Sequence, residues 1–119
     1  MNNSILVIDD DESIRESFKE ALEILGHNVI TAENGKVALD ILKTQGLPKL
    51  ILLDIRMPVM DAAQFRVEQM ANSVFSQIPV VLVSSDDEIK VSARKLSVQA
   101  YLKKPLNFLD LASVVNQYC

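Results

Sequence analysis

The sequence has no tryptophan, one cysteine, three glycines and four prolines among its 119 residues. Cys119 has no second cysteine to pair with, which excludes a disulfide framework and a cysteine-rich metal site. With so little glycine and proline, the composition is neither collagen-like nor of low complexity, and 49% hydrophobic residues suffice to form a core. A chain of this length is expected to form one domain, residues 1–119.

Long apolar runs and an excess of basic charge are also missing. The longest apolar runs, at 5–8, 50–53 and 80–83, are far shorter than the roughly 20 residues of a membrane-spanning helix. The N-terminus, MNNSILVIDDD, lacks the basic segment of a secretory or mitochondrial signal. Twelve basic and sixteen acidic residues give a net charge of −4, which argues against a nucleic-acid-binding surface. We therefore expect a cytoplasmic protein that binds neither membrane nor nucleic acid through these residues.

Short apolar strands alternate with amphipathic helices along the chain. Runs rich in β-branched and other apolar residues predict strands at 4–8, 28–32, 50–53, 80–83 and 100–102. A helix is predicted after each strand, the third beginning near Asp61 and the fourth capped from within Ser84-Ser85-Asp86-Asp87. The residues expected to face the core are, helix by helix, Ile14, Phe18, Ala21, Leu22 and Leu25; Val37, Ala38, Ile41 and Leu42; Ala62, Phe65 and Met70; Ile89, Ala93 and Leu96; and Leu109, Ala112 and Val115.

Five strands alternating with five helices favour an α/β fold in which a parallel sheet is covered on both faces. For a doubly wound sheet of this size the common strand order is 2-1-3-4-5, which is the flavodoxin-like (βα)5 fold. The apolar first, third and fourth strands suit central positions. The short fifth strand, followed by Lys103 and Lys104, suits an edge.

Polar residues follow the ends of these strands, where open parallel sheets bind their ligands. They are Asp9 and Asp10 after the first strand, Asp54 after the third, Ser84 after the fourth and Lys104 after the fifth. Three carboxylates at one edge repel one another unless a cation neutralises them, and Mg²⁺ binds through one or two carboxylates. An ammonium and a hydroxyl beside them complete the groups needed to transfer a phosphoryl group to Asp54.

Each of these residues also has a simpler explanation when it is taken alone. A carboxylate after a strand often begins a solvated loop, and Asp11 and Glu12 are expected only to cap and begin the first helix. Ser84 alone would cap a helix, and Lys104 alone would be a charge on an edge strand. The joint placement of these groups is what favours a functional site.

The strings ILVIDDDESIR, LILLDIRMPVMD, VVLVSS and AYLKKP resemble, in order and spacing, the motifs of the response regulator receiver domain. The resemblance covers nearly the whole chain. It implies that Asp54 is the phosphoacceptor and that Mg²⁺, or Mn²⁺ in its place, is held by Asp9, Asp10, Asp54 and the backbone carbonyl of Arg56. Of the acidic pair, Asp10 is the expected direct ligand.

The same resemblance assigns the remaining groups of the site. It implies that Ser84 contacts the phosphoryl group, that Lys104 is the family's lysine and that Tyr101 is its switch aromatic. The Lys104–Pro105 bond is expected to be cis. The output surface is expected on the fourth helix, fifth strand and fifth helix, with Ile89, Lys90, Arg94, Tyr101 and Lys103 as candidate contacts.

The implied partners are a histidine kinase or histidine phosphotransfer protein as donor, and a downstream protein or effector domain as target. A phosphorylation-dependent homodimer is left open. The chain is not expected to be an enzyme, because it would catalyse only its own phosphorylation and dephosphorylation. His27, between the first helix and second strand, has no expected role in the chemistry.

Several positions depart from the family pattern. Ala62 stands where glycine is usual, Ser97-Val98-Gln99 replaces a Gly-Ala-Asp-like approach to the last strand, and Leu106 replaces a common phenylalanine. These changes bear on loop geometry and the partner surface. Arg56 and Asp86 each lie two residues beyond a site residue, and either form an ion pair across the path of an attacking water or are two separate solvated charges.

Three other functions compete with the phosphoacceptor switch. Asp9-Asp10-Asp11 after an apolar strand superficially matches phosphohydrolases that form an aspartyl phosphate, although their later motifs do not follow. A receiver-like interaction module that works without phosphate is the second alternative. A flavodoxin-like cofactor carrier is disfavoured, because an acidic rim repels a flavin phosphate.

Overall fold

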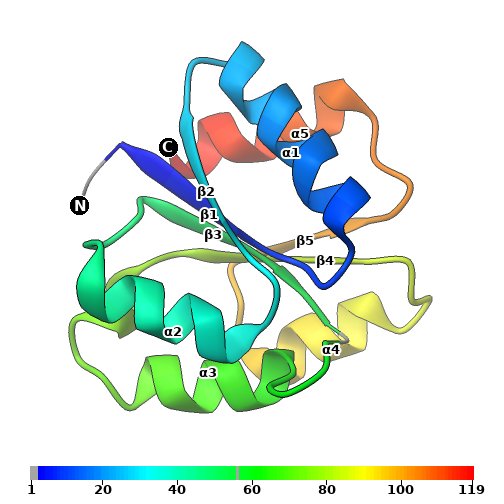
Figure 1. The fold of residues 1–119 in the computed structure, drawn as a ribbon. Helices are drawn as coiled ribbons and strands as arrows, with labels where there is room; N and C mark the ends of the chain where they lie inside the picture. The colour runs from blue at the N-terminus through cyan, green and yellow to red at the C-terminus, as the bar shows by residue number, and fades with distance from the viewer. Residues whose placement is uncertain (1–2, 56) are drawn as a thin grey trace.

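A parallel sheet of five strands forms the centre of the computed structural model, which describes residues 3–55 and 57–119 (Figure 1). The strands are β1 (Ser4–Ile8), β2 (Asn28–Ala32), β3 (Leu50–Asp54), β4 (Val80–Ser84) and β5 (Ala100–Lys103). Their order, β2-β1-β3-β4-β5, confirms the predicted order and places β5 at an edge.

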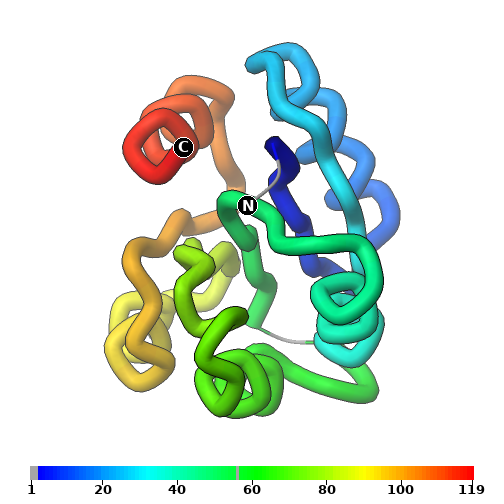
Figure 2. Tube along the Cα trace, turned by 90° about the vertical axis from the view of Figure 1, so that its left-hand side faces the viewer, coloured from blue at the N-terminus to red at the C-terminus, as the bar shows by residue number. Residues whose placement is uncertain are grey.

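Helices cover both faces of the sheet, also as predicted. The helices α1 (Glu12–Ile24) and α5 (Phe108–Tyr118) lie on one face. The helices α2 (Gly35–Thr44), α3 (Ala62–Met70) and α4 (Ile89–Leu96) lie on the other, as the upper and lower layers of Figure 2 show. A short 3₁₀ helix (Phe75–Gln77) precedes β4. No helix in the described ranges has the length and apolar character needed to cross a membrane.

The central strands are apolar throughout because each of their faces packs against helices. In β1, Leu6 and Ile8 belong to the cluster shared with α2, α3 and α4. Ile5 and Val7 point the other way and pack with Phe18 and other residues of α1 and α5. Successive residues of a strand alternate between faces, so burial on both sides requires an unbroken apolar run.

Three helix predictions are corrected by the structure. The start of α4 is not capped by a residue of 84–87: Glu88 is the N-cap, and its side chain accepts no cap hydrogen bond. Leu109, which was predicted to face the core, is 78% exposed, and Leu111 packs in the core beside Val115 instead. The reason is that α5 begins at Phe108 with Asn107 as its cap, which fixes the side of the helix that meets the sheet.

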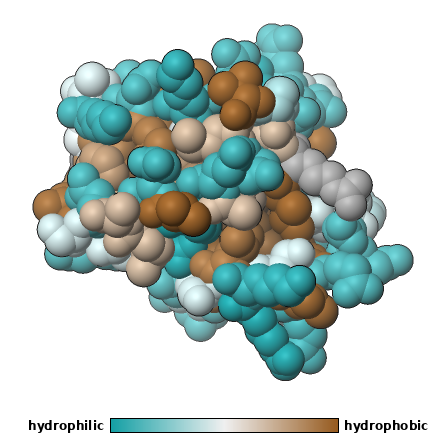
Figure 3. All heavy atoms as spheres, turned by 90° about the horizontal axis from the view of Figure 1, so that it is seen from below, coloured by the Kyte–Doolittle hydropathy of each residue, from teal (hydrophilic) through white to brown (hydrophobic). Residues whose placement is uncertain are grey.

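The third correction concerns α3, whose buried face is partly polar. Its buried residues are Ala62, Phe65, Arg66 and Gln69, at helical spacing, whereas Met70, predicted to face the core, is 52% exposed. The apolar pattern misled because Arg66 and Gln69 occupy core positions and apolar side chains lie outside. The surface on the side of α2, α3 and α4, seen from below in Figure 3, accordingly shows apolar side chains among polar ones.

Arg66 and Gln69 form a hydrogen-bonded network that ties α3 to the end of α4. The Arg66 guanidinium donates to the carbonyls of Leu96 and Ser97 at 2.9 and 2.8 Å and to Gln69 Oε1 at 2.7 Å. Gln69 Nε2 in turn donates to the carbonyls of Phe75 and Ile78. A guanidinium suits this place because the last carbonyls of a helix lack partners within it and carry partial negative charge.

The departures from the family pattern do not disturb the fold. Ala62 lies in the first turn of α3, and in the described ranges only Val59 and Ser97 are non-glycine residues with positive φ, so position 62 does not require glycine. Gln99 accepts a hydrogen bond from the Val80 amide through its side chain and from the Tyr118 hydroxyl through its carbonyl. Leu106 packs at the edge of the α1 and α5 core cluster.

The loop before α3 contains a strained turn. Val59 has φ of 68°, and the Met60 amide donates to the Pro58 carbonyl at 2.7 Å, which is the hydrogen bond of a γ-turn with positive φ. A β-branched side chain is disfavoured in this conformation. The loop is held against α2, since the Gly35 amide donates to the Met60 carbonyl, and a Cβ at position 35 would lie 2.8 Å from Met60 Cγ.

Candidate functional site

The register of the sheet brings three carboxylates to one edge. Ile8 of β1 pairs with Leu53 of β3, so the next residues, Asp9 and Asp54, come side by side where the two strands end. Asp10 follows in the loop to α1. Carboxylate oxygens of Asp9, Asp10 and Asp54 all lie within 4.8 Å of one another. The predicted acidic cluster is therefore assembled by parallel pairing of the central strands.

Asp9 is buried and held at four points. Its amide donates to the Ala32 carbonyl of β2, and its carbonyl accepts from Arg15 Nη1 at 2.8 Å. Asp9 Oδ1 accepts from the Asp11 amide and Oδ2 from Lys104 Nζ, each at 3.0 Å. A carboxylate with 3% of its side chain exposed requires such donors, because a buried charge without partners is strongly disfavoured.

Lys104 reaches the cluster from the end of β5. Its ammonium lies 3.0 Å from Asp9 Oδ2 and 3.5 Å from Asp54 Oδ1. Its amide donates to the Ser84 carbonyl at 2.8 Å, which extends the pairing of β4 with β5 by one step. The Lys104–Pro105 peptide bond is cis, as predicted. Among the described residues, the Lys104 ammonium faces three carboxylates, so negative charge is in excess there.

Burial and neighbouring charges shift the pKa values of Asp54 and Lys104. Burial raises the pKa of the Asp54 carboxyl to about 6, with the charge of Asp9 as the second cause and that of Asp10 adding less, while Lys104 acts in the opposite direction. Burial tends to lower the pKa of Lys104, but the hydrogen bond to Asp9 and the charge of Asp54 outweigh it and raise that pKa overall. With a pKa of about 6, the Asp54 carboxyl is mostly ionised at neutral pH, and it lies beside two further acidic side chains.

The cluster fits a hard divalent cation. Asp10 is exposed, and no side chain in the described parts of the molecule donates a hydrogen bond to it, so its carboxylate is open to a ligand. Carboxylate oxygens are the ligands that Mg²⁺ prefers, and Mg²⁺ commonly uses one or two of them. Arg56, whose carbonyl is the remaining predicted ligand, lies outside the described residues, and so does its predicted pairing with Asp86.

Ser84 lies at the end of β4 and Tyr101 within β5. Ser84 is buried, and its Oγ accepts from the Asp86 amide at 3.0 Å, so in this state the hydroxyl organises the loop that leads to α4. Tyr101 is 41% exposed on the outer edge of the sheet. The structure brings Ser84 to the same rim as Asp54 and Lys104, and it places Tyr101 at the surface.

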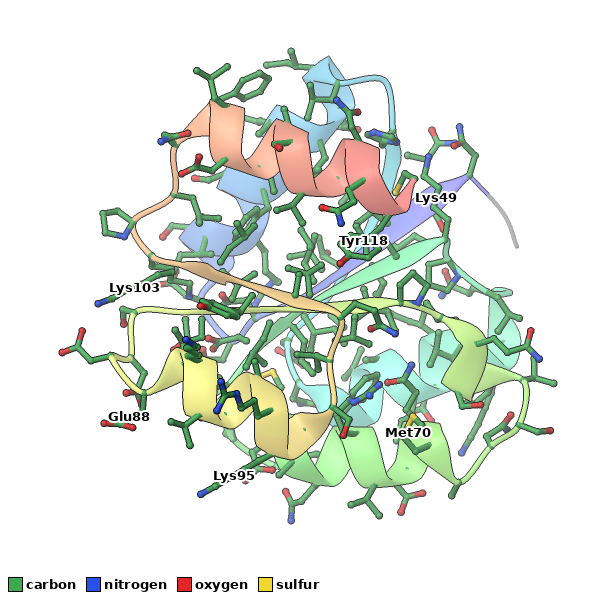
Figure 4. All side chains as sticks on the ribbon, turned by 180° about the vertical axis from the view of Figure 1, so that it is seen from behind. Lys49, Met70, Glu88, Lys95, Lys103 and Tyr118 are labelled. Carbon is green, nitrogen blue, oxygen red and sulfur yellow. The ribbon has the colours of Figure 1, made fainter. Side chains whose placement is uncertain are left out.

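The expected output surface is largely exposed. Lys90, Arg94 and Lys103 are exposed together with Tyr101. Ile89 is the exception, because it is only 3% exposed and belongs to the core. Lys103 forms an ion pair with Asp87, and the side chains of Lys95 and Lys103 project outward from this side of the molecule (Figure 4). Basic residues therefore cluster over α4 and β5 of an acidic chain.

Arg15 was missed as a contributor to the site by reasoning from sequence. Arg15 lies in α1 outside the run of apolar residues predicted to face the core, which suggests a solvated side chain. Its guanidinium nevertheless donates a hydrogen bond to the Asp9 carbonyl. The spacing of residues along the chain does not predict this contact, because the contact depends on how the Arg15 side chain turns back over the start of its own helix. His27 lies away from the rim, with Nδ1 2.7 Å from Lys49 Nζ.

Comparisons with known sequences agree with this architecture. Residues 5–116 match the response regulator receiver domain. The chain is 34% identical over 117 residues to a 14.6 kDa protein of the sodA1 3′ region of Leptolyngbya boryana, covering 97% of this chain and 88% of that protein. It is 31% identical over 120 residues to the transcriptional regulatory protein CrdR of Helicobacter pylori, covering 99% of this chain and 55% of CrdR. The chain thus spans about half the length of CrdR and of other regulators that it matches.

Solved structures show the same fold. The chemotaxis protein CheY4 of Vibrio cholerae superposes with a TM-score of 0.87 and 25% identity, covering 100% of both chains. The receiver domain of the Francisella response regulator 1452 superposes with a TM-score of 0.85 and 28% identity, covering 98% of this chain and 96% of that one.

Proposed function

The chain belongs to the response regulator receiver domain family, and on that premise we propose that it is a phosphoacceptor switch with Asp54 as the acceptor. The observation that carries the proposal is the convergence of three carboxylates, from Asp9, Asp10 and Asp54, with the Lys104 ammonium at one rim of the sheet. The donor is a phosphohistidine of a histidine kinase or histidine phosphotransfer protein. Such donors draw on ATP, so we place the exchange in the cytoplasm.

The transfer requires an ionised acceptor in line with the donor. A carboxylate oxygen of Asp54 forms a bond to phosphorus while the bond from phosphorus to the donor nitrogen breaks, and the electron pair of that bond stays on nitrogen. With a pKa of about 6, Asp54 is mostly ionised at neutral pH. Its poorly compensated charge also makes it ready to accept an electrophile.

The remaining groups stabilise the transferred phosphoryl group. Asp10 and Asp54, with Asp9 behind them, would hold Mg²⁺ or Mn²⁺, and the predicted carbonyl of Arg56 would complete the protein ligands. When bound, the metal supplies positive charge to the phosphoryl oxygens. Lys104, 3.5 Å from Asp54 Oδ1, is close enough to pair with a phosphoryl oxygen after a small movement. The chain would catalyse only its own phosphorylation and the later hydrolysis.

Phosphorylation changes the contacts that hold the loop before α4. A phosphoryl group adds about −1.5 to −2 charges and three acceptor oxygens. The Ser84 hydroxyl, which now accepts from the Asp86 amide, can instead donate to a phosphoryl oxygen. Such a move shifts the population of the loop, of α4 and of Tyr101, and it changes the surface of α4, β5 and α5. That surface would contact a downstream protein, an effector domain or a second copy.

Intact mass spectrometry tests this proposal. The purified chain is incubated with acetyl phosphate and Mg²⁺, and we expect the mass of one phosphoryl group to be added. Asp54→Asn should lose the addition, whereas Asp40→Asn, at an exposed acid of α2, should retain it. An unmodified parent chain would refute the proposal and favour a phosphate-independent interaction module. Steady turnover of a phosphomonoester would favour a phosphohydrolase.

A further inference from the structure

Arg15 holds the backbone on which the metal-binding loop is built. Arg15 is the fourth residue of α1, and its guanidinium donates from Nη1 to the Asp9 carbonyl at 2.8 Å. That carbonyl belongs to the rigid peptide plane that joins Asp9 to Asp10. Fixing the oxygen therefore fixes the orientation of the plane that enters Asp10.

The plane that leaves Asp10 is fixed as well. The Asp11 amide donates to Asp9 Oδ1 at 3.0 Å, and the Asp11 side chain accepts from the amides of Ser13 and Ile14 as the cap of α1. Both peptide planes around the Asp10 Cα are thus held. Their orientation determines where the Asp10 Cβ points, although the Asp10 carboxylate is itself exposed.

The charge of Arg15 is not a sufficient reason for its position. A cation near the start of a helix opposes the helix dipole, and a cation near a metal site repels the metal. Judged by charge alone, Arg15 should weaken the binding of a divalent cation. Its geometry acts in the opposite sense, because the hydrogen bond fixes the peptide plane and with it the direction of the Cα–Cβ bond from which the Asp10 carboxylate extends.

We propose that Arg15 is a positioning residue for the metal site: by holding the Asp9–Asp10 peptide, it directs the Asp10 carboxylate toward Asp54. This inference rests on the proposed function, since it presumes that Asp10 binds Mg²⁺. Removing Arg15 should raise the Mg²⁺ affinity if its charge dominates and lower it if its hold on the peptide dominates. The sign of the change in affinity, as well as its size, therefore tests the inference.

The test compares Arg15→Gln with two other variants. Arg15→Gln removes the charge and the reach of the side chain. Arg15→Lys retains the charge but has a shorter reach and no planar fork. Lys19→Gln is the matched control, because Lys19 is an exposed cation one helical turn further along α1. Mg²⁺ affinity is measured by titration of backbone amide resonances, and the same spectra before metal is added report the geometry of the loop.

We expect Arg15→Gln to weaken Mg²⁺ binding by roughly tenfold, at the low end of losses seen when groups behind a metal ligand are removed. Arg15→Lys should bind more weakly than the parent, and Lys19→Gln should bind like it. In the metal-free spectra, the amides of Asp10 and Asp11 should shift in both Arg15 variants and stay in place in Lys19→Gln.

Unchanged or tighter Mg²⁺ binding by Arg15→Gln, with the parent binding normally, would overturn the role of Arg15 and leave the proposed function intact. If the parent chain bound no Mg²⁺, the proposed function would fail and this inference with it. Should Arg15→Gln not fold, Arg15→Lys decides. Mg²⁺ binding equal to that of the parent, although the amides of Asp10 and Asp11 have shifted, would show that the held peptide does not set the affinity and would overturn the role of Arg15.

Discussion

Replacing Asp54 with asparagine is expected to stabilise the metal-free protein, and the gain should grow with pH. The carboxylate is 88% enclosed by the fold, with only 12% of the side chain exposed, and it lies beside Asp9 and Asp10. Burial and these charges raise its pKa from 3.8 to about 6. The folded protein therefore retains a proton on Asp54 over a pH range in which the unfolded chain has released it.

The sign and size follow from proton linkage. Below pH 3.8 both states are protonated at Asp54, and the shift has no effect on stability. Between pH 3.8 and about 6 the unfolded chain ionises and the folded one resists, so stability falls as pH rises. Above that window the loss amounts to about 3 kcal/mol, at about 1.4 kcal/mol for each unit of pKa. Asparagine has no charge and escapes this loss.

Urea unfolding followed by far-ultraviolet circular dichroism measures the effect, since the chain has no tryptophan to report by fluorescence. With EDTA present, the free energy of unfolding of Asp54→Asn minus that of the parent should rise by more than about 1 kcal/mol between pH 5 and pH 8. Because His27 titrates in both proteins, its contribution cancels in the difference. Adding Mg²⁺ should narrow the gap by stabilising the parent.

A control separates this effect from general acid removal. Asp40 is an exposed acid of α2, and Asp40→Asn should change stability by less than about 0.5 kcal/mol, with no trend over the same pH range. If the difference between Asp54→Asn and the parent were flat with pH, or fell as pH rose, the view of Asp54 as a buried and poorly compensated charge would be wrong.

Two further predictions concern stability away from the acidic cluster. Arg66→Met should lower the free energy of unfolding by about 2–4 kcal/mol in urea, because it leaves Gln69 Oε1 and two carbonyls at the end of α4 without their donor; Met70→Ala, on the exposed side of the same helix, should cost far less, and equal losses would contradict the network. Val59→Gly should raise the free energy of unfolding by about 1 kcal/mol, because glycine adopts positive φ without a steric penalty. The same change at exposed Val67, inside α3, should not stabilise. A lower thermal stability of Val59→Gly would refute the strain.

Strand positions and the acidic cluster were predictable from the sequence. Apolar runs at 5–8, 50–53 and 80–83 mark central strands because a parallel sheet covered on both faces allows no polar alternation. Once the strand order is set, the residues that follow adjacent strands must meet at one edge. The meeting of Asp9, Asp54, Ser84 and Lys104 at one rim was therefore predictable from the sequence.

Helix faces were less predictable where polar groups are buried. Hydropathy marks Met70 and Leu109 as core residues, yet both are exposed, and Arg66 and Gln69 are enclosed. A guanidinium can be buried only where several acceptors converge on it. For Arg66 these come from α4 and from its own helix, thirty residues and three residues away along the chain.

The strand order, the acidic edge and the groups that meet there could be predicted from the sequence, because they depend on periodicity along the chain and on which residues end each strand. The ionisation and the orientation of those groups depend instead on how the elements pack in space. The raised pKa of Asp54 arises from burial and from charges on another strand, and the hold of Arg15 on the Asp9 carbonyl arises from a side chain turning back over its own helix. Both depend on which groups lie close together in space, and the pattern of residues along the chain does not report that.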